Sequence, residues 1–249
     1  MSEADAASGR MAQLPKRFYD RVDICETGEG WGVRLDDKEV LTPARARLEV
    51  PNRLLARAIG DEWEAQTTRI DPDTMPLTRL ANTTLDGVRG KEGEVAGDIA
   101  SYAGSDLVCY RADTPEGLVA MQCEHWDPVL AWAGETLEAR FVSVAGIMHR
   151  DQPADALSAV RAALDHYDAF ALAALHTITT LTGSALLALA HATGRLSAEE
   201  AWAAAHVDED WQISQWGEDE EAAKRHAVRW REMAAAAQVL GTLAAGQQR

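Results

Sequence analysis

The spacing of apolar residues changes partway along this chain of 249 residues, and this change restricts the fold more than any other feature. Near the start, apolar and polar residues alternate, and Phe18, Val22 and Ile24 fall on one face of an extended segment. The alternation returns in residues 31–35 and 40–50, after turns rich in glycine and aspartate. Short runs with a period of two, separated by such turns, predict antiparallel β-hairpins.

After Pro51 the apolar residues recur every three or four positions, at Leu55, Ile59 and Trp63. This spacing predicts a helix, which we expect to cover the apolar face of the preceding sheet. The segment from Asp71 to Leu80 contains two prolines and therefore cannot be one continuous helix. It is expected to be an ordered connection.

From about Gly93 onward, helical spacing dominates. The predicted helices cover residues 92–104, 116–138, 154–182, 184–194, 198–214 and 218–245. Two short apolar runs between them, Leu107 to Tyr110 and Phe141 to Val144, are candidates for strands.

Residues 169–192 form the most apolar region, but polar residues and the pair Gly183-Ser184 interrupt it. A membrane-spanning helix needs about 20 apolar residues without such a break. Gly183 is suited to end one helix and Ser184 to cap the next. We therefore expect a buried helical hairpin at the centre of a bundle.

These patterns predict an α+β protein with a small N-terminal antiparallel β domain and a larger C-terminal helical domain. Residues 1–16 are small and polar and predict a flexible tail. Residues 17–90 would form the β-rich domain with its covering helix, and residues 91–249 the helical domain.

The formal net charge of −16 comes from 40 acidic and 24 basic residues. Such a surface repels nucleic acid and anionic membranes, which are therefore poor partners. A cationic surface on another protein is a better one. The same charge favours a monomer, because like-charged copies repel each other.

Three widely spaced cysteines, Cys25, Cys109 and Cys123, cannot form a framework of disulfides. A reducing compartment is expected: the cytoplasm of a bacterium, or the mitochondrial matrix if the source is eukaryotic. The first 16 residues have neither the apolar run of a secretory signal nor the arginine-rich pattern of a presequence.

No motif for a nucleophile, a zinc site or a phosphate-binding loop is present in the sequence. Cys123, Glu124 and His125 are adjacent, but neighbouring residues on a helix point in different directions, which disfavours a metal site. The glycines of residues 28–32 are better explained by a hairpin turn. We therefore expect no catalytic residue, no cofactor and no metal.

The segment from Asp208 to Glu221 has the least ordinary composition, with seven carboxylates, two tryptophans and Gly217. Acidic residues after Gly217 would stabilise the first turn of the last helix through its dipole, which explains Glu218 to Glu221 without any partner. Trp211 and Trp216 are less simply explained, because aromatic residues beside charge are typical anchors of protein interfaces. Both interpretations remain open on composition alone.

The chain resembles the assembly chaperones for the alpha subunit of F-type ATP synthase, which occur in mitochondria and alpha-proteobacteria. The resemblance covers about residues 16–245. The residues that carry it are, in chain order, Lys16-Arg17-Phe18-Tyr19, Leu35-Asp36-Asp37, Thr42-Pro43, Glu62-Trp63-Glu64-Ala65-Gln66, Met75-Pro76-Leu77-Thr78, Asn82-Thr83, Asp86, Asp106-Leu107-Val108-Cys109-Tyr110-Arg111, Trp126-Asp127-Pro128, Gln212, Trp216-Gly217 and Glu220.

The resemblance implies a non-catalytic chaperone that binds the unassembled alpha subunit, prevents its aggregation and hands it to the beta subunit. It also implies that an acidic residue after Trp216-Gly217 is functional; Glu220 matches best, with Glu218 and Glu221 as alternatives. The complete set of expected partner-binding residues is Glu220, Glu218, Glu221, Trp216, Trp211 and Gln212.

Two other functions remain open. The chain could be a small-molecule enzyme with a carboxylate and histidine site at the domain junction, near Met75 to Thr83. It could also be a structural subunit that stays in a complex.

Overall fold

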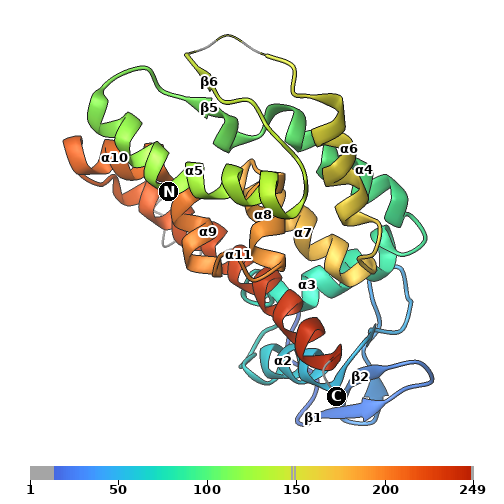
Figure 1. The fold of residues 1–249 in the computed structure, drawn as a ribbon. Helices are drawn as coiled ribbons and strands as arrows, with labels where there is room; N and C mark the ends of the chain where they lie inside the picture. Colours follow the sequence, from blue (N-terminus) through green and yellow to red (C-terminus); the bar gives the residue numbers. More distant parts are fainter. Residues whose placement is uncertain (1–13, 147, 149, 248–249) are drawn as a thin grey trace. The chain divides into compact units, whose positions relative to one another are not determined.

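A computed structural model describes residues 14–146, 148 and 150–247 (Figure 1). These residues form two compact units. The β unit comprises the residues up to Arg89 together with those from Gly241 onward, and the helical unit comprises Gly90–Leu240. The fold is α+β, with the antiparallel sheet before the helices, which confirms the predicted fold class. The predicted division into separate domains, residues 17–90 and 91–249, stays a prediction.

The β unit is built on an antiparallel sheet of strands β1 (Val22–Glu26), β2 (Trp31–Leu35), β3 (Lys38–Glu39) and β4 (Glu49–Val50). β1 and β2 form the predicted hairpin, whose turn is closed by a hydrogen bond from the amide of Thr27 to the carbonyl of Gly30. β3 pairs with one end of β2 and β4 with the other. The loop between β3 and β4 leaves the sheet and is closed by a bridge between Leu41 and Arg47.

The predicted alternation does not extend back to Phe18: its side chain is 64% exposed, whereas that of Tyr19 is 3% exposed. The alternation fails here because Arg17 pairs with Thr68 and not with the hairpin, so this segment is not continuous with β1. The hydroxyl of Tyr19 donates to the carbonyl of Trp63 at 2.6 Å. The predicted tail of residues 1–16 lies largely outside the described residues; Lys16 forms a bridge with Arg69.

Helix α2 (Arg53–Glu64) packs against β1 and β2, as predicted. Asn52 caps it by accepting a hydrogen bond from the amide of Leu55 at 2.9 Å. A 3-10 turn (Pro72–Thr74), helix α3 (Pro76–Thr83) and a π-helical segment (Thr84–Val88) follow. The segment from Asp71 to Leu80 is thus more helical than expected, because Pro76 starts a helix and does not break one.

Glu62 supplies the cap that α3 lacks in its own sequence. Its carboxylate accepts hydrogen bonds from the amides of Leu77 and Thr78, both at 2.7 Å, and from the hydroxyl of Thr78 at 2.7 Å. Burial raises the pKa of Glu62, although these three hydrogen bonds and Arg79 oppose the rise. The carboxylate of Glu62 therefore holds the start of α3.

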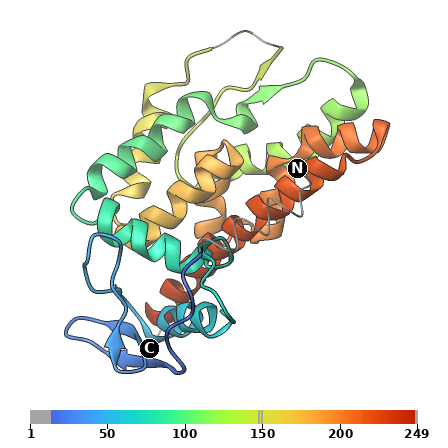
Figure 2. The ribbon, with the colours of Figure 1, turned by 180° about the vertical axis from the view of Figure 1, so that it is seen from behind.

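The helical unit contains eight α-helices among its described residues, together with two short strands (Figures 1 and 2). The helices are α4 (Glu92–Tyr102), α5 (Glu116–Thr136), α6 (Ala154–Leu164), α7 (Ala169–Thr182), α8 (Ala185–Ala192), α9 (Ala198–Ala205), α10 (Val207–Trp216) and α11 (Glu220–Gln247). β5 (Tyr110–Arg111) and β6 (Val144–Ala145) pair in parallel. The last residues of α11 are grouped with the β unit.

The hairpin of α7 and α8 forms the core of the helical unit, as predicted. Gly183 ends α7 with a positive φ of 69°, and the hydroxyl of Ser184 caps α8 by accepting from the amide of Leu187. α7 packs against α4, and α8 packs against α5 and α9. In the described part of the chain, no helix combines the length and the apolar character that crossing a bilayer requires.

Two predicted helices are each divided in the structure. Residues 154–182 separate into α6 and α7 at residues 165–168, where Asp168 caps α7 by accepting from the amide of Ala171. Residues 198–214 separate into α9 and α10 at His206. The predicted strand at 107–110 is mostly a 3-10 turn, with only Tyr110 in β5. No proline or glycine marks either helix break, and only Asp168, a residue type suited to cap a helix, gives a local signal for the first of them.

Candidate functional site

The acidic segment singled out in the sequence forms a helical hairpin of α10 and α11. Gly217 joins the two helices with a φ of 86°, a conformation that favours glycine. Asp219 then caps α11, because its carboxylate accepts from the amide of Ala222 at 2.7 Å. Three acidic residues in the first turn of α10, Asp208 to Asp210, stabilise its positive end.

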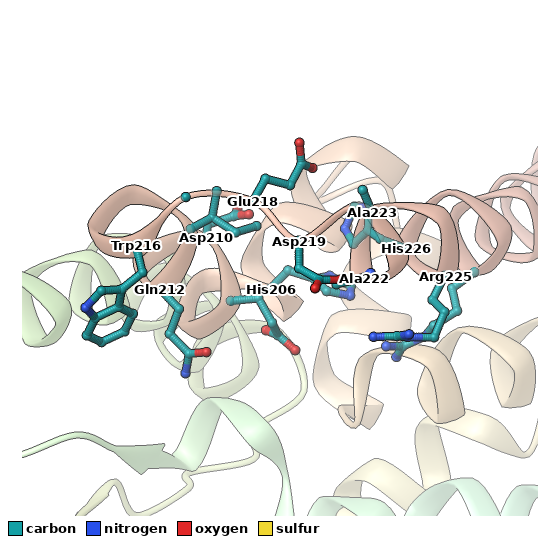
Figure 3. A pocket seen from close by; sticks show the side chains of 14 residues that line it. His206, Asp210, Gln212, Trp216, Glu218, Asp219, Ala222, Ala223, Arg225 and His226 are labelled. Carbon is teal, nitrogen blue, oxygen red and sulfur yellow. Dashed lines mark hydrogen bonds between the residues drawn. The ribbon is translucent and has the colours of Figure 1, made fainter.

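A groove of about 500 Å³ lies between α10 and α11. We refer to it as the hairpin groove; its lining residues from α9–α10 and the turn are His206, Glu209, Asp210, Gln212, Ile213, Trp216, Gly217, Glu218 and Asp219, and from α11 they are Ala222, Ala223, Arg225, His226 and Arg229. Figure 3 shows Gln212 and Trp216 on the α10 side and Arg225 and His226 on α11. Acidic residues therefore come from α10 and the turn, and basic residues from α11.

The groove brings together Gln212, Trp216 and Glu218, three of the predicted partner-binding residues. Glu220 and Glu221 are exposed on the first turn of α11, outside the groove lining. They form ion pairs one helical turn apart, Glu220 with Lys224 at 3.0 Å and Glu221 with Arg225 at 3.6 Å. Exposed pairs of this kind contribute only about 0.3–0.5 kcal/mol, so their role in the fold is small.

The prediction that all four acidic residues after Gly217 lie in the first turn of α11 is wrong. Glu218 precedes the helix, and Asp219 is its cap. Only Glu220 and Glu221 lie in the first turn. The helix dipole therefore explains fewer of these carboxylates than the sequence indicates.

The two tryptophans of this segment have different environments. Trp216 is 79% exposed at the end of α10. Trp211 is half-buried, and its ring lies so close to Gly117 of α5 that a β-carbon there would be 2.4 Å from the ring. Trp216 is thus available to a partner, whereas Trp211 fastens α10 to α5.

Gly117→Ala should therefore destabilise the protein by about 1–3 kcal/mol, because the new methyl group would collide with Trp211. Urea unfolding would measure the change. Gly97→Ala is the matched control, since Gly97 is an exposed glycine within α4 and an added methyl group there would meet no atom within 4 Å; this variant should gain roughly 0.5–1 kcal/mol. Equal gains in both variants would show that Trp211 does not pack on Gly117.

Two histidines that line the hairpin groove, His206 and His226, are hydrogen-bonded to Trp202. The indole of Trp202, only 7% exposed, donates to Nε2 of His226 at 2.9 Å, and Nδ1 of His206 donates to the carbonyl of Trp202 at 2.8 Å. Burial lowers the pKa of His206, although its hydrogen bond to Trp202 opposes this. His206 is therefore neutral near pH 7 and serves packing and hydrogen bonding.

Sequence reasoning missed the basic side of the groove and the apolar contribution of Ile213. Arg225 and Arg229 are four residues apart and therefore lie on one face of α11, a spacing that is visible in the sequence. Ile213 is 42% exposed and precedes Trp216 by three positions, so the two share a face of α10. Both signals identify a surface only when the two helices are known to be adjacent.

Potential metal ligands are scattered over the molecule. Within residues 14–146, 148 and 150–247, no group of three or more histidine, cysteine or acidic side chains is arranged to hold a metal ion. Cys123 is exposed on α5.

Comparison with known proteins identifies the family. Residues 16–134 match the model of the family described as "ATP12 chaperone protein". A curated relative, "Protein atp12, mitochondrial" of Schizosaccharomyces pombe, is 24% identical over 202 residues, which cover 76% of this chain and 69% of the relative.

Solved structures are more similar. The crystal structure of Atp12 from Paracoccus denitrificans is 39% identical, with a TM-score of 0.85 over 91% of this chain and 97% of that one. The Atu1473 protein of Agrobacterium tumefaciens is 52% identical, with a TM-score of 0.89 over 92% of this chain and 87% of that one. Identities this high over nearly whole chains indicate common descent as well as a common fold, and we conclude that this chain belongs to the ATP12 chaperone family.

Proposed function

We propose that this protein is an assembly chaperone of F-type ATP synthase. It binds the unassembled alpha subunit, prevents its aggregation and hands it to the beta subunit. Membership of the ATP12 chaperone family supports the general role. The observation that carries the binding site is the exposed Trp216 beside a groove lined by Glu209, Asp210 and Glu218.

Trp216 has the properties of an interface anchor. A tryptophan that is 79% exposed leaves a large apolar surface in water, and covering it on binding is favourable. Its neighbours in the turn and on α11 are predominantly acidic and exposed. Complementary charge on the client would accelerate encounter and disfavour wrong partners.

Transfer to the beta subunit requires reversible binding. The hairpin groove combines charges of both signs with apolar surface and is small beside a standard protein interface, so we expect moderate affinity. An assembly chaperone of this kind needs no catalytic step, cofactor or metal. We expect it to act as a monomer, in the bacterial cytoplasm or in the mitochondrial matrix of a eukaryote.

Reversing the charge at Glu220 tests this function. Glu220→Lys should abolish protection of the alpha subunit, because a cation would replace a carboxylate that is exposed beside the groove. Light scattering of purified alpha subunit, with and without the chaperone, would measure protection. Glu218→Lys and Glu221→Lys would show which acidic residue matters most.

Glu124→Lys is the matched control, since Glu124 is exposed on α5 and does not line the groove. Glu124→Lys should retain full protection. The free energies of unfolding of Glu220→Lys and Glu124→Lys, measured in urea, should lie within about 0.5 kcal/mol of the wild-type value. If Glu220→Lys, Glu218→Lys and Glu221→Lys all protected the client normally, the acidic surface would not be the binding site. Failure of the wild type to bind the alpha subunit would refute the function itself.

A further inference from the structure

The hairpin groove continues into a second hollow at the carboxyl end of α7. This hollow has a volume of about 450 Å³ and includes residues 180–183, Leu107 and Trp126. The two hollows share four lining residues: His206, Glu209, Gln212 and Arg229. Together they form one elongated depression within the helical unit, running from Trp216 to the end of α7.

The apolar surface of this depression is uncovered. Ile213 and Trp216 are 42% and 79% exposed on α10, and the facing residues of α11 are Ala222 and Ala223. Alanines leave room above a helix for the side chains of another element. The depression can therefore receive bulky aliphatic groups.

The depression carries a net negative charge, because five carboxylates line it (Asp208, Glu209, Asp210, Glu218 and Asp219) against two guanidinium groups. Arg225 pairs with Glu221, and Arg229 donates to the carbonyl of Leu181 at 2.6 Å. Among the residues that the structure describes, Glu209, Asp210 and Glu218 have no ion-pair partner. At the far end, the hydrogen bond from Arg229 already satisfies a carbonyl at the carboxyl end of α7, so the free negative charge lies on the α10 side.

The walls of the depression also restrict the backbone conformation of an occupant. They are mainly helices, whose internal backbone groups are already paired, and no residue of a described strand lines either hollow. An extended segment would leave its own amides and carbonyls without partners against apolar surface, which is costly. A helix satisfies these groups internally and needs only side-chain contacts.

We infer that this depression binds a short amphipathic helix of the client, with Leu- or Ile-type residues on the face towards Ile213 and Trp216, and with Arg or Lys along the edge towards α10. The inference rests on the proposed chaperone function and specifies the element that the chaperone recognises.

Three synthetic peptides of about 18 residues, or roughly 27 Å of helix, test the inference. The first carries a leucine stripe at helical spacing flanked by arginines. The second has the same composition in an order that destroys the stripe, and the third has glutamates in place of the arginines. Binding is followed by titration calorimetry and by the tryptophan emission of the full chain.

We expect the first peptide to bind at least tenfold more tightly than either of the others. It should also shift the emission to shorter wavelength, and the shift should be largely lost in Trp216→Phe, because Trp216 would become covered. Glu209→Gln should weaken the first peptide about threefold to tenfold, with Glu124→Gln, remote from the depression, as the control. Equal binding of the first two peptides, or no binding of the first, would overturn the inference.

Protection of the full alpha subunit separates this inference from the proposed function. If the wild type protects the alpha subunit but Ile213→Glu and Glu209→Arg protect equally well, the client is bound elsewhere and the inference fails alone. If the wild type does not protect the alpha subunit at all, the proposed function fails. Glu124→Arg is the charge-matched control for Glu209→Arg.

Discussion

Asp106→Ala is expected to lower the free energy of unfolding by about 3–5 kcal/mol, because several buried donors would lose their acceptor. Asp106 is completely buried. Its carboxylate accepts from the amide of Leu186 at 3.1 Å, at the start of α8, and from the amide of Val108 at 3.3 Å. Urea unfolding would measure the loss. Asp113→Ala, at an exposed aspartate nearby in sequence, should change stability by less than about 0.5 kcal/mol.

The same residue predicts a pH dependence of stability. Burial raises the pKa of Asp106 from 3.8 to about 6, against the hydrogen bonds that favour its ionised form. Because the folded pKa lies above the unfolded one, the folded state binds this proton more tightly. The contribution of Asp106 to stability is therefore greatest below the unfolded pKa and declines as the pH rises to about 6.

Comparison with Asp106→Asn, which does not titrate, isolates this effect. The stability of the wild type relative to the variant should fall by about 2 kcal/mol between about pH 4.5 and about pH 7.5. A difference that stays constant over this range would show that Asp106 has an ordinary pKa in the folded protein.

Glu62→Ala should destabilise the β unit by about 2–4 kcal/mol, since it removes the carboxylate that accepts three hydrogen bonds at the start of α3. Glu64→Ala provides a control in the same helix. Glu64 is exposed, and its ion pair with a guanidinium nitrogen of Arg57 is long at 3.7 Å. Its loss should therefore cost less than about 0.5 kcal/mol. Equal effects of the two substitutions in urea unfolding would contradict the capping role of Glu62.

Many residues that carry the family resemblance pair with one another inside the fold. Thr42 donates to Asp86 at 2.6 Å, and Arg111 forms an ion pair with Asp127 at 2.9 Å. These contacts join segments that are 44 and 16 residues apart in sequence. Such residues maintain the scaffold, whereas Trp216 is exposed and makes no comparable contact within the described fold.

Local sequence was sufficient where the determining interaction is local. The hairpin of β1 and β2, the Asn52 cap of α2 and the Gly183-Ser184 turn between α7 and α8 all depend on residues within a few positions of each other. The family and the fold class were also available from sequence, because they rest on a pattern spread over the whole chain.

Tertiary structure alone decided the features that depend on distant residues. The two tryptophans of the acidic segment look equivalent in sequence, and only the position of Gly117 distinguishes half-buried Trp211 from exposed Trp216. Likewise, Asp106 caps a helix that begins about 80 residues later, and the hairpin groove exists only because α10 and α11 lie side by side. Sequence spacing encodes the period of a helix or strand, but not which surfaces meet after the chain has folded.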